Sequence, residues 1–187
     1  MKFAITQKQA EAMIGCLIEY IGDDRDSEHC KDTPKRVIKS YAELFGGYSK
    51  TPQDALGTTF KASKHDQMVI CKDIELYSTC SHHMLPFFGK AHIAYVPGSR
   101  IVGLSKLARL VEVYSRRLQV QERLTDQIAQ AMQDVLKPRG VMVVIEAKHM
   151  CMSCRGIQKQ HSSMVTSAIR GVFKKPAARA EFMGLIK

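Results

Sequence analysis

Two clusters of metal-binding side chains, each at the end of a strand-like run, constrain the fold of this chain more than any other feature. The first is Cys80-Ser81-His82-His83, which follows an alternating apolar and polar run over residues 67–79. The second, His149-Met150-Cys151-Met152-Ser153-Cys154, follows an unbroken apolar run over residues 141–147. Because thiolate and imidazole are ligands that zinc prefers, the pattern predicts that two strand ends meet in space and hold one zinc ion.

The hydrophobic pattern predicts helices both before these strands and between them. Apolar residues recur at helical spacing over residues 6–21, and Asp32-Thr33-Pro34 predicts the start of a second helix that ends at Gly46-Gly47. Residues 48–65 lack a clear period and are expected to be a connector. The remaining elements are expected to be strands at 67–79 and 90–96, two helices that flank Gln121-Glu122, strands at 141–147 and 164–173, and a short helix at 177–186. The order ββααββ predicts an α+β domain over residues 66–187, with helices on one face of an antiparallel sheet, behind a helical region and connector over residues 1–65.

Length and composition narrow the class of protein. A chain of 187 residues suits one domain with a helical extension, and no apolar run approaches the roughly 20 residues that span a bilayer. The first residues lack the apolar core of a signal peptide, so a cytoplasmic location without membrane contact is expected. Six unevenly spaced cysteines do not form a disulfide scaffold. The formal net charge of +10 indicates an anionic partner, which leaves nucleic acid and nucleotides open.

Two kinds of metal site fit the clusters. A closed structural site would use Cys80, His83, Cys151 and Cys154 as four ligands. An open site would use Cys80, His83 and Cys151 and leave the fourth position for water, as catalytic zinc requires. In the open site His82 and His149 are free for proton transfer, and the spacing of two between His149 and Cys151 predicts that both lie on the same face of a strand.

Several side chains between and after the clusters suit an anionic substrate. Gly103-Leu104-Ser105-Lys106-Leu107-Ala108-Arg109 is expected to open a helix with the Ser105 hydroxyl at its cap and with Lys106 and Arg109 on one face, a plausible cradle for phosphate as well as an ordinary basic surface. Arg155 follows Cys151 by four residues and adds a cation near the metal.

A glutamate between the two helices suits recognition of a base. If Glu122 is buried, its carboxylate can accept hydrogen bonds from a ring N–H and an exocyclic amino group together, which would select guanine. The alternative is an ordinary glutamate at a helix start.

Four motifs in order resemble GTP cyclohydrolase I of the zinc-dependent type, from about Asp32 to Leu185. They are Ser78-Thr79-Cys80-Ser81-His82-His83-Met84-Leu85-Pro86-Phe87, the Gly103–Arg109 segment, Arg117-Leu118-Gln119-Val120-Gln121-Glu122-Arg123-Leu124-Thr125, and His149-Met150-Cys151-Met152-Ser153-Cys154-Arg155-Gly156. The resemblance implies the tunnelling fold, in which ββααββ subunits close into a barrel. It also implies a toroidal homodecamer of two pentamers with active sites at subunit interfaces.

The resemblance also implies a role for each matching residue. Cys80, His83 and Cys151 match the ligands of one zinc ion per subunit, and His82 and His149 match the histidines that assist proton transfer. Glu122 matches the guanine anchor with the backbone of Gln121 beside it, Ser105, Lys106, Arg109 and Arg155 match the triphosphate contacts, and Arg36 matches a phosphate-binding arginine from the neighbouring subunit. The implied reaction opens the imidazole ring of GTP with zinc-activated water, releases C8 as formate and closes 7,8-dihydroneopterin triphosphate, the first step of folate and pterin biosynthesis.

Two departures from the family pattern keep other hypotheses open. The family usually has Glu where this chain has Ser81, which suggests a repurposed relative that stops at a ring-opened formamidopyrimidine. The family does not need a thiol at Cys154, which is expected not to be a ligand. The basic charge and the four metal-competent side chains also suit a zinc-stapled nucleic-acid-binding module, although the chain lacks the interleaved aromatics that single-strand surfaces use.

Overall fold

A computed structural model describes residues 5–63 and 65–187, and the chain divides into two units at residues 46 and 47. The first unit is a pair of packed helices, α1 (Gln7–Tyr20) and α2 (Thr33–Leu44). A capping box begins α1, where Thr6 Oγ1 accepts from the Gln9 N–H at 3.3 Å and Gln9 Oε1 accepts from the Thr6 N–H at 2.8 Å. Asp32 precedes α2 as expected, but its side chain makes no capping hydrogen bond.

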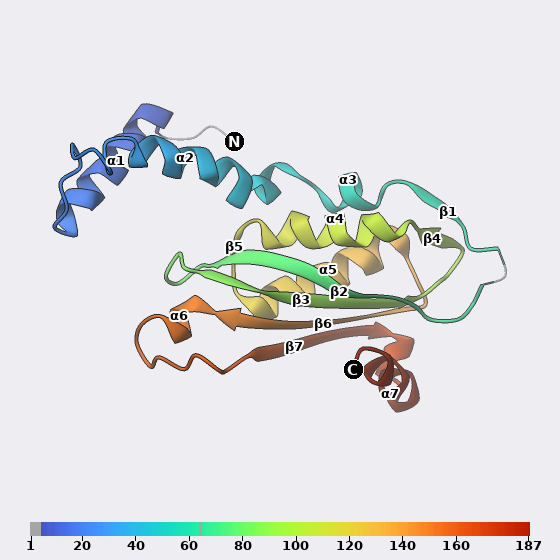
Figure 1. The fold of residues 1–187 in the computed structure, drawn as a ribbon. Helices are drawn as coiled ribbons and strands as arrows, with labels where there is room; N and C mark the ends of the chain where they lie inside the picture. The colour runs from blue at the N-terminus through green and yellow to red at the C-terminus, as the bar shows by residue number, and fades with distance from the viewer. Residues whose placement is uncertain (1–4, 64) are drawn as a thin grey trace. The chain divides into compact units, whose positions relative to one another are not determined.

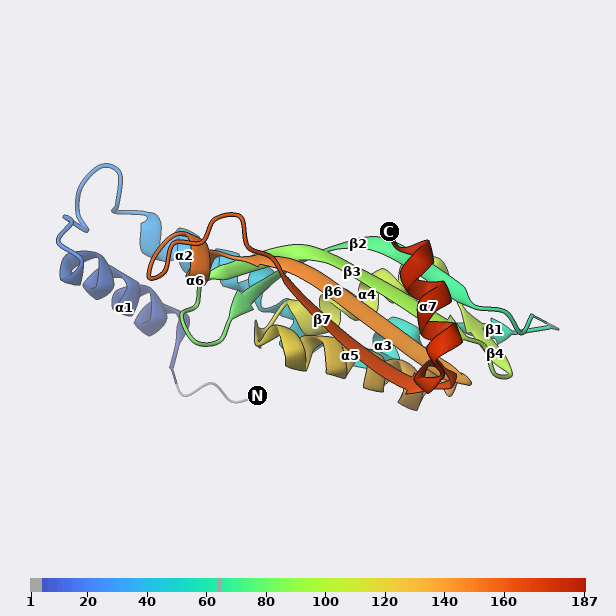
Figure 2. The same ribbon diagram turned by 90° about the horizontal axis from the view of Figure 1, so that it is seen from below.

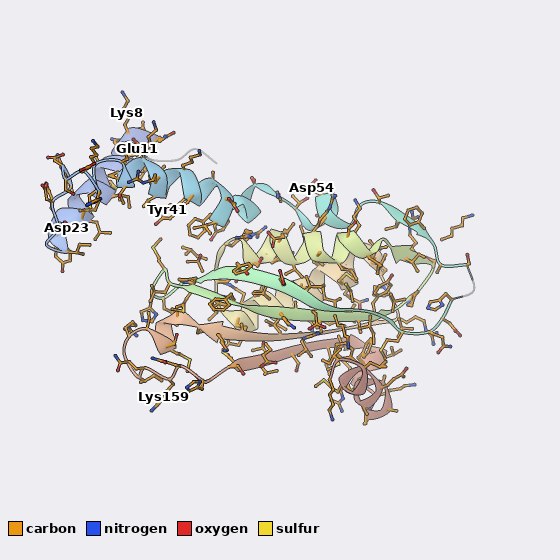
Figure 3. The ribbon with its side chains drawn as sticks, in the orientation of Figure 1. Lys8, Glu11, Asp23, Tyr41, Asp54 and Lys159 are labelled. Atoms are coloured by element: carbon orange, nitrogen blue, oxygen red, sulfur yellow. The ribbon has the colours of Figure 1, made fainter. Side chains whose placement is uncertain are left out.

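The segment 48–65, expected to be a connector, contains regular structure. It holds the second half of a 3₁₀ turn, η1 (Gly46–Ser49), a short helix, α3 (Pro52–Leu56), and a strand, β1 (Thr59–Lys61). β1 pairs antiparallel with β4 (Arg100–Val102). Thr51 and Asp54, the latter labelled in Figure 3, form the capping box of α3. The connector prediction is therefore wrong, because elements this short complete too few turns to show a period. The second unit begins at Gly47, whereas the sequence placed a domain boundary after residue 65.

One arginine anchors the start of the second unit to its sheet. The Arg117 guanidinium donates through Nη2 to the carbonyl oxygens of Gly47 at 2.8 Å and Lys50 at 3.1 Å. It also contacts the rings of Tyr48 and Tyr114, with its central carbon 5.6 and 5.0 Å from their centroids. These contacts fix residues 47–50 beside the start of the third motif, which Arg117 begins.

A five-stranded sheet forms the main domain, in the order β5-β2-β3-β6-β7 (Figure 1). All pairs are antiparallel except β2 with β5. The strands are β2 (Val69–Cys80), β3 (Pro86–Val96), β5 (Leu118–Gln119), β6 (Gly140–His149) and β7 (Met164–Gly171). Both β3 and β6 extend further toward the two clusters than the sequence predicted, because their ends are polar or aromatic and break the apolar pattern.

Helices cover both faces of the sheet, though unequally. α4 (Leu104–Ser115) and α5 (Gln121–Leu136) lie with α3 along one face and bury the main core, which includes Phe87, Ile93 and Ile145. On the opposite face, α7 (Pro176–Leu185) and the 3₁₀ turn η2 (Val172–Lys174) cover one end through Phe182 and Phe173 (Figure 2). The order ββααββ is confirmed, and the expected restriction of helices to one face holds for α4 and α5. In residues 5–63 and 65–187, no helix combines the length and apolarity needed to cross a membrane.

Candidate active site

The first cluster lies in the tight loop that joins β2 to β3. Cys80 is the last residue of β2 and is 5% exposed, while His83 in the loop is exposed. The Cys80 N–H donates to Leu85 O at 2.8 Å and the Met84 N–H donates to Cys80 O at 2.9 Å, with Met84 in the left-handed region at a φ of 55°. This closed loop holds His83 Nδ1 4.0 Å from Cys80 Sγ.

The second cluster joins the first across β3. β6 ends at His149, and the short helix α6 (Met150–Ser153) then carries Cys151 back toward the loop after β2. The ligand atoms of Cys80, His83 and Cys151 all lie within 4.8 Å of one another. The three side chains expected to bind zinc are therefore brought together by strand ends that lie far apart in the sequence.

The chemistry of this cluster suits a cation. Partial burial and, after it, the adjacent Cys80 raise the pKa of the Cys151 thiol, because two thiolates at such a distance repel each other. A cation between them removes that penalty, and the spacing is compatible with zinc bonds of about 2.3 Å to sulfur and about 2.0 Å to nitrogen. Cys154 lies outside this group and is exposed. It lines a hollow of about 350 Å³ with Lys148 and His149. Because, in the part of the chain that the structure describes, only the ligand atoms of Cys80, His83 and Cys151 are grouped within 4.8 Å of one another, the geometry favours three protein ligands over four.

The two histidines proposed for proton transfer differ in their surroundings. His82 is exposed beside His83, whereas His149 is half-buried and stacks on Phe87 with ring centroids 4.5 Å apart and planes 5° apart. Burial lowers the pKa of His149, and the charge of Glu122 opposes that shift. The expectation that His149 and Cys151 share a strand face is wrong, because the chain turns into α6 directly after His149.

A glutamine connects His149 to the rest of the domain. Gln121 Oε1 lies 2.7 Å from His149 Nε2, and Gln121 Nε2 lies 3.0 Å from Ile145 O and 2.9 Å from Met164 O. Gln121 is 1% exposed. Gln121 and Glu122 form the first turn of α5 and do not lie between helices as the sequence suggested. Glu122 is exposed in this chain at the start of α5, and it lies close enough to His149 to affect its pKa.

Three of the expected phosphate contacts lie far from this cluster. Ser105, Lys106 and Arg109 are in the first two turns of α4, which starts beside β4 and ends beside β5 (Figure 1). Because α4 has 12 residues, its first turn lies roughly 17 Å from the end that leads to β5 and Cys80. Gly103, and not Ser105, is the N-cap, and Ser105 and Arg109 are exposed. A single chain therefore does not bring these side chains to the cluster.

The two remaining arginines expected to contact phosphate, Arg155 and Arg36, belong to different units of the chain. Arg155 lies beside the cluster, where its Nη1 donates to Cys151 O at 3.3 Å, as its spacing predicted. Arg36 belongs to the helical unit of α1 and α2, where it is exposed, donates to His29 O at 3.1 Å and pairs with Asp32 at 3.7 Å.

Two contributors to the site were not identified from the sequence. Phe87 fixes the ring plane of His149 because the two residues are register partners across β3 and β6. Gln119 supports the loop of the first cluster, since its carbonyl accepts from the Ser81 N–H at 2.9 Å. Alternation along β3 indicates which face Phe87 occupies, but its partner depends on a pairing that skips both α4 and α5.

Comparisons with known proteins decide the family. The family model of GTP cyclohydrolase I matches residues 10–187. The chain belongs to the GTP cyclohydrolase I family. It is 56% identical over 178 residues to GTP cyclohydrolase 1 of Wolinella succinogenes, covering 95% of each chain. It is 53% identical over 185 residues to GTP cyclohydrolase 1 of Streptomyces griseus, covering 98% of this chain and 92% of the relative.

The family and the ββααββ sheet together confirm the tunnelling fold. Among solved structures, the apo form of the archaeosine synthase QueF-Like is similar with a TM-score of 0.46 and 16% identity, over 56% of this chain and 93% of that one. At that identity and score the likeness carries nothing about activity. Neither the partial-reaction relative nor the nucleic-acid-binding module gains support from these relatives.

Proposed function

We propose that this protein is a zinc-dependent GTP cyclohydrolase I whose active site is completed by a second copy of the chain. The observation that carries the proposal is the group of Cys80, His83 and Cys151 beside His149, in a chain that matches the family over residues 10–187. The activity is hydrolysis of the imidazole ring of GTP, with release of formate and formation of 7,8-dihydroneopterin triphosphate. A cytoplasmic location is part of the proposal.

The metal is proposed to be one zinc ion per chain. Cys80, His83 and Cys151 would hold it, and their two sulfurs and one imidazole nitrogen are soft enough to favour zinc over calcium or magnesium. When bound, zinc supplies a Lewis acid that lowers the pKa of water to about 7. The Arg155 contact to Cys151 O supports the α6 turn that carries one of these ligands.

The side chains around the cluster are proposed to have different roles toward the substrate. His82 and His149 would move protons, since both imidazoles lie beside the ligand residues and are not needed as ligands. Glu122 would anchor guanine, because it is exposed at the first turn of α5 yet close to His149. The base would then lie next to the metal, with its exocyclic amino group toward the carboxylate.

The triphosphate would be bound by cations that the cluster itself lacks. Arg155 is adjacent to the cluster, whereas Ser105, Lys106 and Arg109 lie at the opposite end of the domain. An exposed N-terminal turn with a lysine and an arginine is a suitable site for phosphate. We propose that these three residues, together with Arg36, act on GTP bound at the cluster of another copy.

Unpaired strand edges support such an assembly. Within the described residues, β7 pairs with β6 alone, and β5 pairs only with Thr79 and Cys80 of β2, which leaves the rest of β2 open. Open edges of this length invite pairing with another chain. The proposed homodecamer would have about ten times the 21.0 kDa mass of one chain, which light scattering on the purified protein measures.

The central experiment is a product assay with zinc measured in parallel. Zinc-loaded protein incubated with GTP should consume one water per turnover, release formate and give a fluorescent pterin after oxidation, whereas ATP should give none. Unchanged GTP would contradict the proposal. A ring-opened formamidopyrimidine without pterin would identify the partial reaction that the replacement of Glu by Ser81 suggested.

A further inference from the structure

Gln121 has a buried side-chain amide whose nitrogen and oxygen both have hydrogen-bond partners. It begins α5, and it contacts backbone or side chains of both β6 and β7 as well as the His149 ring. The side chain is 1% exposed, so each contact replaces a hydrogen bond to water. Such a group holds its partners in one arrangement, and the direction of each hydrogen bond can be worked out.

Two carbonyl groups determine which way the amide faces. Ile145 O and Met164 O lie 3.0 and 2.9 Å from one end of the Gln121 amide, and a carbonyl oxygen can only accept. That end must therefore be the NH₂ group, since the reverse orientation would place three acceptor oxygens against one another in a buried site. The oxygen Oε1 consequently points at His149.

A pair of threonines agrees with this orientation. The Thr125 hydroxyl donates to Gln121 O at 2.7 Å, which uses its one hydrogen. The contact of 2.6 Å between the hydroxyls of Thr125 and Thr166 must then have Thr166 as donor. Thr166 Oγ1 is left as an acceptor facing Gln121 Nε2, which lies 3.1 Å away and whose two hydrogens are shared among this hydroxyl, Ile145 O and Met164 O. The hydrogen bonds therefore all run in one consistent direction.

The orientation of Gln121 fixes which nitrogen of His149 carries the proton. Gln121 Oε1 can only accept, so His149 Nε2 at 2.7 Å must donate. A neutral imidazole has a single N–H, so Nδ1 carries a lone pair. Stacking on Phe87, with the planes 5° apart, stabilises the ring plane in which Nε2 lies against Gln121.

We infer that Gln121 is a positioning residue that holds His149 as the Nε2–H tautomer and makes Nδ1 the atom that exchanges protons with the substrate. The inference rests on the proposed role of His149 in GTP hydrolysis. In the step concerned, the Nδ1 lone pair takes a proton from the reacting group, Nε2 keeps its own proton and its bond to Gln121, and the same proton later returns from Nδ1. The side chain of Gln121 itself does not touch the substrate, because it is enclosed by β6, β7 and His149.

The test uses ¹⁵N-histidine-labelled, zinc-loaded protein and solid-state NMR, which distinguishes protonated from unprotonated ring nitrogens. The His149 signal is assigned as the one lost in His149→Asn. At a pH where the ring is neutral, the unsubstituted protein should show a protonated Nε2 and an unprotonated Nδ1. Gln121→Met, similar in length and without hydrogen bonds, should abolish the single-tautomer signature.

Kinetics of the same variants separate positioning from folding. Gln121→Met should lower kcat by about 10- to 100-fold, the usual cost of losing a partner that orients a functional histidine. The KM for GTP should change little, because the backbone at Gln121 is intact. Thr166→Val is the matched control: it removes a hydroxyl from the opposite side of the same amide, so it should cost stability but leave the His149 signature unchanged.

Two results would overturn the inference. One is an unsubstituted protein whose His149 carries its proton on Nδ1, and the other is a Gln121→Met variant that keeps both the Nε2–H signature and its kcat. Absence of GTP turnover in the unsubstituted protein would instead contradict the proposed function, while the NMR result would still report on the tautomer.

Discussion

The two ends of the main sheet carry different parts of the proposed site, and they are organised in different ways. At the end where β2 and β6 finish, Cys80, Gln121 and Phe87 are buried. Cys80 belongs to the ligand group, while Gln121 and Phe87 both contact His149, so this cluster is assembled within one chain. At the other end, Ser105 and Arg109 are exposed on the first turns of α4, without a comparable buried scaffold. The first turn of α4 lies roughly 17 Å along that helix from the end that leads to β5 and Cys80.

The difference indicates which part of the reaction needs rigid geometry within a chain. Metal ligation and proton transfer depend on distances of a few ångströms, so a prebuilt cluster serves them. A triphosphate is recognised by charge, which acts over a longer range and can be supplied by flexible cations of another copy. If this is correct, substitutions at the cluster end should reduce zinc binding, and substitutions at the cation end should reduce kcat/KM for GTP. Subunits that carry one substitution each should also restore activity when they are mixed.

The largest effect is expected at the cluster end. Cys151→Ser should lose bound zinc and lower the rate of pterin formation by more than about 100-fold, because a ligand contributes more than the outer partners that cost about 10- to 100-fold. Elemental analysis and the fluorescence assay measure both properties. Cys154→Ser is the matched control, since its thiol lies outside the ligand group and should leave zinc and activity intact. Loss of zinc from Cys154→Ser would favour the four-ligand site.

A smaller effect is expected at the cation end. Lys106→Met removes one charge-assisted contact, worth about 1.5–3 kcal/mol, and should lower kcat/KM for GTP by roughly 10- to 100-fold while the zinc content stays unchanged. Lys174→Met, an exposed lysine on η2, is the control for loss of charge and should have little effect. Zinc loss in Lys106→Met would show that the two ends are not independent.

Mixing the two variants tests whether one active site combines the metal cluster of one chain with the cations of another chain. Co-expressed Lys106→Met and Cys151→Ser subunits should recover activity that neither has alone, because some interfaces would combine an intact cluster with an intact Lys106. Activity no higher than the sum of the separate variants would contradict the shared site.

The smallest effect is expected between the two ends, on the face of the sheet that α4 and α5 leave open. His92 Nδ1 accepts from the Asp73 N–H at 3.2 Å, where β2 bulges and Asp73 has a φ of 59°. Burial is the main cause that lowers the pKa of His92, and the positive charges of Lys90 and Lys72 lower it further. The negative charges of Asp73 and Glu146 oppose this shift. A depressed pKa in the folded state means that its stabilising contribution is present above the unfolded value of about 6.5 and is lost as pH falls through the folded pKa.

Thermal melting at two pH values measures this contribution. Between pH 7.5 and 5.5 the Tm of the unsubstituted protein should fall by about 2–4 °C more than that of His92→Gln, for a loss of about 1 kcal/mol in a chain of this size. Both proteins lose zinc affinity in acid, so the difference between them isolates His92. Parallel Tm profiles would show that His92 does not titrate in this range.

The sequence predicted the order of elements and the meeting of the two clusters because both depend on local signals. Alternation located β2 and β6, and the cysteines and histidines at their ends allowed one metal site. Prediction failed where elements were too short to show a period, as at α3 and β1. It also failed at His149, where the chain turns from strand into α6 and the period of two no longer applies.

The amino-acid sequence by itself determined the family, the ββααββ order and the set of residues available for metal, protons and phosphate, because side-chain chemistry and local periodicity are properties of the chain. Only the tertiary structure decided how those residues are grouped. The pairing of β3 with β6 places Phe87 on His149, and the packing of α5 on β6 and β7 turns Gln121 toward the same ring. The direction of α4 separates its cations from the cluster, since contacts between distant segments depend on packing that no local pattern encodes.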